Sequence, residues 1–401
     1  MLMTRLELED FEFREEDDRV KFIFEKYYHF FVDKSVLEKI GSFKVHRDFI
    51  DFDVSEKTLN NKINMILKIG MDELTNVLGK KTVFIHRGSG IPLLGTNEFG
   101  IVDRDTNIIE VKAHTLCNLD CIYCSVDAGR SSRKGVDFVV EHEFLLEEFD
   151  RVASPKKKPV EASINPQGEP LMYSHIFDLV KGLKASKNVK IVSINTNGVL
   201  LTEELVDRLI SAGLDSIHLS LNTLNGETAS RLSGAFYPLE KVKKIVQYCD
   251  GKIDLIIAPI IVPGHNDGQI EELLKFCLTL KNVPRFGFQN FLNYQRGRNP
   301  VKQNSMDWFM DVLKKYQSEL GVKLIYSADD FSIFHDEKIP KPFKKNQVVE
   351  AKVVCMGKYP REFIAVAENR CITVSGDLKI NQYVKVKIVR EKHNIFRGTI
   401  S

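Results

Sequence analysis

The chain is 401 residues long, 43% hydrophobic and 28% charged, with a formal net charge of +2 at pH 7. A chain of this length is too long for one ordinary domain, and its hydrophobic fraction is high enough to form hydrophobic cores. Two or three domains are therefore expected. No apolar run approaches the roughly 20 residues that a membrane-spanning helix needs, and the small net charge by itself indicates no partner.

Cysteine usage indicates a reducing compartment. The chain has 7 cysteines, an odd number, and Met1 is followed by a polar, acidic stretch rather than the apolar core of a secretory leader. We therefore expect a cytoplasmic protein in which clustered thiols serve metal binding or catalysis rather than disulfides. The four isolated cysteines are expected to be buried small hydrophobic residues: Cys249, Cys277, Cys355 and Cys371.

Residues 1–105 contain no cysteine and are predicted to form an N-terminal α+β extension, whose role the sequence does not indicate. Aromatic side chains are frequent in residues 20–32, and their periodicity leaves a helix and a pair of strands open as alternatives. Residues 55–77 have the apolar stripe of a helix, and residues 82–85 predict a strand.

From residue 108 onward, short apolar runs alternate with amphipathic helices. Strands are predicted at residues 108–111, 160–164, 189–194, 216–221, 253–261 and 286–291, and helices at residues 174–185, 203–212, 239–248, 268–280 and 305–320. Thr202 and Gly213 are start and stop signals for the second helix. The alternation predicts an α/β domain over residues 106–338, a partial (β/α)6 TIM-type barrel with its chemistry at the carboxyl ends of the strands.

Three cysteines follow the first of these strands. Cys117, Cys121 and Cys124 have the spacing C-x3-C-x2-C. Thiolates this close together can bind one soft metal centre, and three cysteines on a four-iron cluster leave one iron without a protein ligand. The spacing alone leaves open three structural cysteines or a zinc site completed by His114, although structural zinc sites commonly use two separated pairs of ligands.

The cysteine spacing, with Tyr123 before the last cysteine and a strand directly before the motif, resembles the signature of the radical S-adenosylmethionine (SAM) superfamily, of the archaeal type. The resemblance covers about residues 108–300. It implies a [4Fe-4S] cluster on Cys117, Cys121 and Cys124, whose open iron chelates the amino and carboxylate groups of SAM. It also implies that an electron from the cluster cleaves SAM to methionine and a 5′-deoxyadenosyl radical.

Polar motifs at successive strand ends support this resemblance, although each motif alone would be an ordinary turn. Residues 167–170, Gln-Gly-Glu-Pro, resemble the Gly-Gly-Glu motif of the superfamily, which implies that Gln167, Gly168 and Glu169 bind the amino group of SAM. Further SAM contacts are implied after the third to fifth strands and beside the last cysteine, at Tyr123, Thr196, Asn197, Ser220, Asn222, Gly264 and Asn266.

The end of the sixth strand is the most polar of all. A barrel that generates a radical needs side chains that position the substrate, and the alternative is a solvated loop. The candidates for substrate contacts are Gln289, Asn293, Tyr294 and Arg298.

Beyond Pro340 and Pro342, which read as a hinge, residues 343–401 change to short strands and are predicted to form a small OB-like β-barrel. Residues 386–396 resemble the end of the TRAM domain, an RNA-binding module. Residues 341–401 carry 13 basic and 5 acidic residues, which would attract phosphates, and aromatic side chains such as Tyr359 and Tyr383 would stack on bases. The alternative is a solvated basic barrel that packs on the main domain.

The predicted function is a radical SAM enzyme that modifies a nucleoside in RNA, specifically tRNA, with an electron donor as a second partner and no membrane. The lack of cysteines in residues 1–105 argues against a typical methylthiotransferase. Two alternatives stay open: a radical SAM enzyme that acts on a protein or small metabolite, and an RNA-binding protein with a structural Fe-S cluster. The sequence identifies neither the modified atom nor the oligomeric state.

Overall fold

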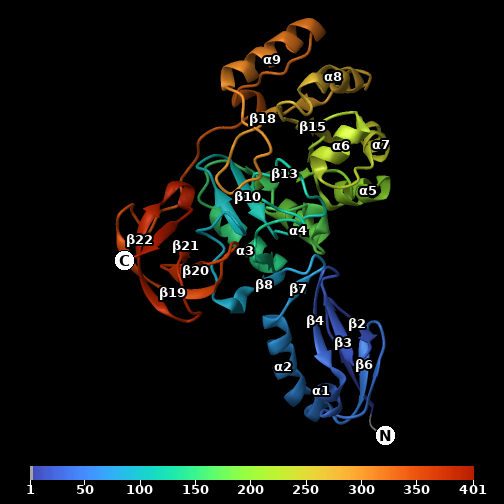
Figure 1. Cartoon of the computed structure of the whole chain (residues 1–401), viewed down its shortest axis with the longest axis vertical. Helices are drawn as coiled ribbons and strands as arrows, with labels where there is room; N and C mark the ends of the chain where they lie inside the picture. The colour runs from blue at the N-terminus through green and yellow to red at the C-terminus, as the bar shows by residue number, and fades with distance from the viewer. Residues whose placement is uncertain (1–2) are drawn as a thin grey trace. The chain divides into compact units, whose positions relative to one another are not determined.

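The computed structural model describes residues 3–401 (Figure 1), which divide into two compact units. The first contains the chain up to Ile85 together with Gly135–Val139, and the second contains His86–Lys134 and Val140–Ser401. None of the helices within residues 3–401 is long and apolar enough to cross a membrane. The four isolated cysteines are all buried, as predicted.

Within the described residues, the first unit has two sheets and two helices, and strands β1 to β8 pair antiparallel with their neighbours among themselves. The larger sheet has the order β11-β8-β7-β4-β3-β2 and the smaller one β1-β6-β5. The elements are β1 (Met3–Glu7), β2 (Phe11–Glu16), β3 (Arg19–Phe24), β4 (Tyr28–Asp33), α1 (Lys34–Glu38), β5 (Phe43–Val45), β6 (Phe49–Asp53), α2 (Glu56–Asp72), β7 (Thr75–Asn76), β8 (Lys81–Ile85) and β11 (Val136–Val140).

The aromatic stretch forms a pair of strands rather than a helix. Strands β3 and β4 pair antiparallel with Phe22 opposite Phe30, and both rings are buried. The predicted helix begins after Ser55, whose side chain accepts a hydrogen bond from the Thr58 amide. Strand β11, which comes from the middle of the sequence, joins this sheet and was not predicted.

The second unit is built on a seven-stranded sheet with the order β17-β15-β14-β13-β12-β10-β9. All neighbours from β10 to β17 are parallel, and β9 pairs antiparallel with β10. The strands are β9 (Gly100–Asp103), β10 (Ile108–Lys112), β12 (Val160–Ile164), β13 (Val189–Thr196), β14 (Ser216–Leu219), β15 (Asp254–Ile257) and β17 (Arg285–Phe286). The sheet curls into a half-barrel, which confirms the predicted fold class.

Five helices follow the strands where they were predicted: α4 (Ile176–Ala185), α5 (Glu203–Ala212), α7 (Leu239–Cys249), α8 (Ile270–Leu278) and α9 (Met306–Leu320). Two more, α3 (His142–Ala153) and α6 (Gly226–Ser233), were not predicted. Thr202 accepts a hydrogen bond from the Leu205 amide at the start of α5, and Gly213 ends that helix in the left-handed conformation. Two short strands, β16 (Ile260–Ile261) and β18 (Gln289–Asn290), pair beyond the ends of β15 and β17.

The C-terminal strands close into a small barrel, drawn in orange-red to red in Figure 1, with the order β19-β20-β21-β23-β22. They are β19 (Val348–Met356), β20 (Glu362–Ala367), β21 (Arg370–Ser375), β22 (Tyr383–Arg390) and β23 (Arg397–Ile400). Buried and exposed residues alternate along β22, because each strand turns every second side chain into the barrel core.

This C-terminal barrel is hydrogen-bonded to the segment that leads into β9. The Cys371 amide donates to the Leu94 carbonyl and the Phe396 amide to the Gly95 carbonyl, both at 2.8 Å. Gly95 has a φ of +116°, and a Cβ there would lie 2.2 Å from the Cys371 carbonyl oxygen. Only glycine allows so close an approach of the two backbones.

Candidate active site

The three cysteines lie on the irregular segment that follows β10, here called the cysteine loop (residues 113–134). Burial, and then the nearby Cys121 thiol, raise the pKa of Cys117 well above its ordinary value. Burial and the Cys124 thiol raise the pKa of Cys121 to about 12. These thiols are partly buried and each disfavours the ionisation of its neighbour, so they need a bound cation to become thiolates together. Their donor chemistry fits an iron–sulfur cluster.

Arg298 holds the cysteine loop in shape. Its five N–H groups donate to the Asp127 and Asp120 carboxylates and to the carbonyls of Asp120, Cys121 and Ala128, at 2.7–3.3 Å. The Arg298 amide also donates to the Cys124 carbonyl at 2.9 Å. Arg298 therefore uses its full hydrogen-bonding capacity on this loop. The sequence proposed it as a substrate contact, and the structure gives it a positioning role.

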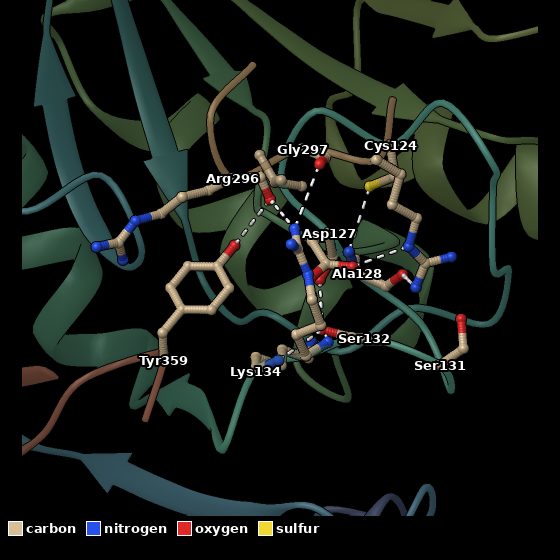
Figure 2. Close-up of polar contacts among 12 residues, drawn as sticks. Cys124, Asp127, Ala128, Ser131, Ser132, Lys134, Arg296, Gly297 and Tyr359 are labelled. Carbon is tan, nitrogen blue, oxygen red and sulfur yellow. Dashed lines mark hydrogen bonds and ion pairs between the residues drawn. The ribbon is translucent and has the colours of Figure 1, made fainter. Parts of the chain in front are cut away.

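Asp127 and its neighbours extend this support, and Figure 2 shows them around Cys124. Arg133 donates to the Asp127 carboxylate from its backbone amide and from Nε, both at 3.1 Å. Its Nη2 atom donates to the Arg296 and Gly297 carbonyls. Burial alone would raise the pKa of Asp127. The hydrogen bonds from Arg298 and Arg133 outweigh burial and lower this pKa. The Ala128 amide donates to the Cys124 sulfur at 3.3 Å, as amides do around cluster thiolates.

The Gln-Gly-Glu motif docks on the residue before the first cysteine. The Glu169 amide donates to the Leu116 carbonyl at 2.9 Å. A Cβ on Gly168 would lie 2.0 Å from that same oxygen, so glycine is required there. The motif and the cysteine loop thus touch through their backbones.

Glu169 is buried at the centre of the strand ends. Its carboxylate accepts hydrogen bonds from the Thr196 hydroxyl at 2.6 Å and from the Asn197 and Leu171 amides at 2.9 and 3.2 Å. Burial nevertheless raises the pKa of Glu169 to about 7. A positive charge nearby would stabilise the ionised form of this buried carboxylate, and the protonated amino group of SAM carries such a charge.

The ends of β13 and β14 meet the cysteine loop around a small cavity. Tyr123, Asn197, Ser220 and Asn222 line it together. The Asn222 amide donates to the Tyr123 hydroxyl at 2.5 Å, and the Asn266 amide donates to the Asn222 carbonyl at 2.8 Å. The sequence assigned these residues, which come from four separate segments, to one ligand, SAM. The structure brings them together.

Gly264 does not join this group. It lies in a turn with a φ of +73°, and nothing lies within 4 Å of where its Cβ would be. The turn geometry explains the glycine without any ligand. Its assignment as a SAM contact stays a prediction that no contact in the structure supports.

The remaining substrate candidates lie apart from one another. Gln289 lines a cavity within the half-barrel, whereas Tyr294 lines a cleft beside the C-terminal barrel. The Asn293 backbone amide donates to the Gln303 side-chain oxygen, and its side-chain amide donates to the Val301 carbonyl. The structure thus does not gather these residues into one site.

Sequence analysis missed a polar network on the sheet face opposite the helices. The His218 Nδ1 and Asn195 Oδ1 atoms are 3.1 Å apart, and the Asn195 amide donates to the Ser163 hydroxyl at 3.3 Å. Burial lowers the pKa of His218 to about 4 and raises that of Glu161, which also lines the cavity of about 540 Å³ there. The signal in the sequence was the period-two polar residues in strands otherwise apolar, such as Val-Glu-Ala-Ser-Ile at 160–164.

Lys358 is a second residue that sequence analysis missed. It comes from the C-terminal barrel and is buried, and its ammonium donates to the Val126 carbonyl at 2.5 Å and to the Gln167 side chain at 2.6 Å. The Gln167 amide group in turn donates to the Asn97 carbonyl at 2.8 Å. Lys358 therefore connects the barrel to both the cysteine loop and the Gln-Gly-Glu motif.

Comparison with known proteins identifies the family to which this chain is similar. Residues 111–277 match the Radical SAM superfamily. The uncharacterised protein MJ0103 of Methanocaldococcus jannaschii is 36% identical over 371 residues, which cover 84% of this chain and 85% of that protein. A GTP 3′,8-cyclase of Peptoclostridium acidaminophilum is 29% identical over 55% of this chain and 66% of its own length, and one of Chlorobaculum tepidum is 34% identical over 36% and 40%.

Solved structures give more distant similarity. Streptococcus suis SuiB matches with a TM-score of 0.44 and 18% identity, over 80% of this chain and 71% of its own. TYW1 with a lysine-pyruvate adduct bound matches with a TM-score of 0.42 and 16% identity, over 58% and 80%.

Proposed function

Because the chain belongs to the radical SAM superfamily, we propose that it uses radical SAM chemistry to modify a nucleoside within RNA, specifically tRNA. Its cofactors are a [4Fe-4S] cluster and SAM, and Cys117, Cys121 and Cys124 would hold the cluster. When bound, the cluster supplies the electron that releases a 5′-deoxyadenosyl radical from SAM, which activates carbon–hydrogen bonds that acid–base chemistry cannot.

The residues of this chain would orient SAM and keep water away from it. Glu169 and the backbone of Gln167 and Gly168 would bind the amino group, and Asn222 would bind ribose hydroxyls. Cys117, Cys121 and Cys124 are only partly exposed, so a bound cluster and SAM would cover most of what remains open to water.

The observation that carries the RNA proposal is the direct attachment of the C-terminal barrel to the cysteine loop through Lys358. A ligand bound to this barrel would be held on the same compact unit as the cysteine loop. On the outer face of β22, Tyr383, Lys385 and Lys387 are exposed at alternate positions, and Tyr383 is 65% exposed. An exposed aromatic ring between basic residues suits stacking on a base with phosphates alongside.

The deciding experiment is mass spectrometry of tRNA nucleosides from a strain that lacks the gene. We expect one modified nucleoside to disappear and to return with the wild-type gene but not with a C121A variant. Tyr383→Ala combined with Lys385→Gln and Lys387→Gln should weaken binding of the full-length protein to tRNA at least tenfold. The matched control K341Q/K344Q removes two charges from exposed positions elsewhere in the tail. An unchanged nucleoside profile would refute the proposal.

A second candidate function is favoured by the cavity of about 540 Å³ inside the half-barrel, which is lined by Asn195, His218 and Glu161. Its size and polar lining suit a small metabolite. If the nucleoside profile is unchanged but His218→Ala abolishes SAM cleavage that a metabolite extract stimulates, this candidate is supported instead.

A further inference from the structure

A cleft of about 460 Å³ lies between the half-barrel and the C-terminal barrel, and no step above uses it. Ser125 and Val126, the two residues after the last cysteine, form part of its wall, and Gln167 forms another part. A ligand in this cleft would therefore touch the edge of the candidate active site.

The cleft is strongly cationic. Five basic side chains line it, Arg104, Arg296, Lys358, Arg390 and Arg397, against the single carboxylate of Glu98. Arg296 is paired with Glu362, and Arg104 with Glu110. Glu98 is buried and already accepts hydrogen bonds from the Thr96 hydroxyl and the Asn97 amide. The basic charge therefore exceeds what the protein itself supplies to balance it.

Arg390 and Arg397 contribute directly to this excess of positive charge. They lie directly opposite each other on the antiparallel strands β22 and β23. Across residues 3–401, neither side chain has an ion pair or a hydrogen bond. Like charges opposite each other on neighbouring strands destabilise a sheet. Burial, and then the charges of Arg397 and Arg104, lower the pKa of Arg390.

We propose that this cleft is a binding pocket for a phosphate-bearing ligand, with Arg104, Arg390 and Arg397 as its anion-binding residues. Guanidinium groups bind phosphate oxygens through paired hydrogen bonds. Asn97, Thr373 and Tyr359 add neutral hydrogen-bonding groups to the wall. The volume suits a nucleotide-sized ligand. The phosphates of a mononucleotide and of an RNA chain share this chemistry, so the pocket does not depend on the tRNA proposal.

The test uses the full-length, cluster-loaded protein under anaerobic conditions and inorganic tripolyphosphate as the probe, with calorimetric titration at about 150 mM salt, where weak surface attraction is screened. We expect R390Q/R397Q to weaken tripolyphosphate binding at least tenfold, and the control K341Q/K344Q to change it less than twofold. Tripolyphosphate should also raise the Tm of the wild type and of the control but not of R390Q/R397Q.

The R390Q/R397Q variant removes a repulsive contact, so it should fold and bind iron like the wild type. R390K/R397K keeps the charge and loses the paired geometry, and it should bind tripolyphosphate with intermediate affinity. Equal losses of tripolyphosphate affinity in R390Q/R397Q and in the control would overturn the proposed pocket. So would a wild-type protein that does not bind tripolyphosphate.

Two further probes identify the source of the phosphate. GTP binding that depends on Arg390 and Arg397, with RNA binding unaffected, supports a pocket for a mononucleotide. Binding of an RNA oligonucleotide that depends on them, with no GTP binding, supports a pocket for the RNA backbone. If the tRNA nucleoside profile is unchanged while tripolyphosphate binding depends on the two arginines, the tRNA proposal fails and the pocket stands.

Discussion

Residues of the candidate active site have roles that their positions in the sequence indicate only in part. Cys121 and Glu169 follow strands of the half-barrel, and burial raises the pKa of both side chains. Arg298, by contrast, follows a polar strand end and was proposed to contact the substrate. Its side chain instead reaches back more than 170 residues to Asp127 and Asp120.

Glu169 makes stability depend on pH in the protein freed of iron and SAM. Its pKa is raised from 4.5 to about 7. The folded state therefore favours the protonated form, and the stability that Glu169 contributes is present below pH 4.5 and lost as the pH rises through about 7. Relative to E169Q, the wild-type free energy of unfolding should fall by about 3 kcal/mol between pH 4.5 and about pH 8. Urea titrations of both proteins at each pH measure it, and parallel pH curves would contradict it.

At the scale of elements, the candidate site is a junction of loops rather than one strand end. The cysteine loop contacts the Gln-Gly-Glu motif through Leu116 and the C-terminal barrel through Val126. Lys358 joins all three, because its ammonium bonds to Val126 and to Gln167. A residue more than 230 positions away in the sequence therefore contacts the cysteine loop directly.

Replacing Lys358 should loosen the cysteine loop. In K358M the Val126 carbonyl and the Gln167 side-chain oxygen lose a buried donor, which should cost about 2 kcal/mol of stability. Amide hydrogen exchange across residues 124–128 should become faster, as mass spectrometry of peptides would show. The control K379M changes an exposed lysine of the same barrel. Exchange as slow as in the wild type would show that the loop holds its shape without Lys358.

At the scale of the whole molecule, the half-barrel and the C-terminal barrel belong to one compact unit. The backbone at Gly95 lies close against the C-terminal barrel, and the Phe396 amide donates to the Gly95 carbonyl. The cleft with Arg390 and Arg397 exists only because the two barrels are held together there. Any substrate that uses both barrels depends on this attachment.

A G95V variant should separate the two barrels. Its Cβ would collide with the Cys371 carbonyl, so the loss of stability should reach about 3 kcal/mol or more. Scanning calorimetry should show the C-terminal barrel unfolding in a transition of its own at a lower temperature. In the control G90V the glycine is also in the left-handed region, with a φ of +69°, but nothing lies within 4 Å of the added Cβ. Identical thermograms for G95V and G90V would refute the role of this contact.

The sequence by itself determined the family and the alternation of strands and helices, and it predicted the cofactor ligands, because these depend on local spacing and periodicity. The aromatic stretch stayed ambiguous, since rings at positions 22, 24, 27, 28, 30 and 31 follow neither a helical nor a two-residue period throughout. Only the tertiary structure decided that β11 completes the first sheet, that Arg298 and Lys358 support the cysteine loop, and that Arg390 faces Arg397. Contacts between distant segments depend on how sheets and barrels close, which no local pattern encodes.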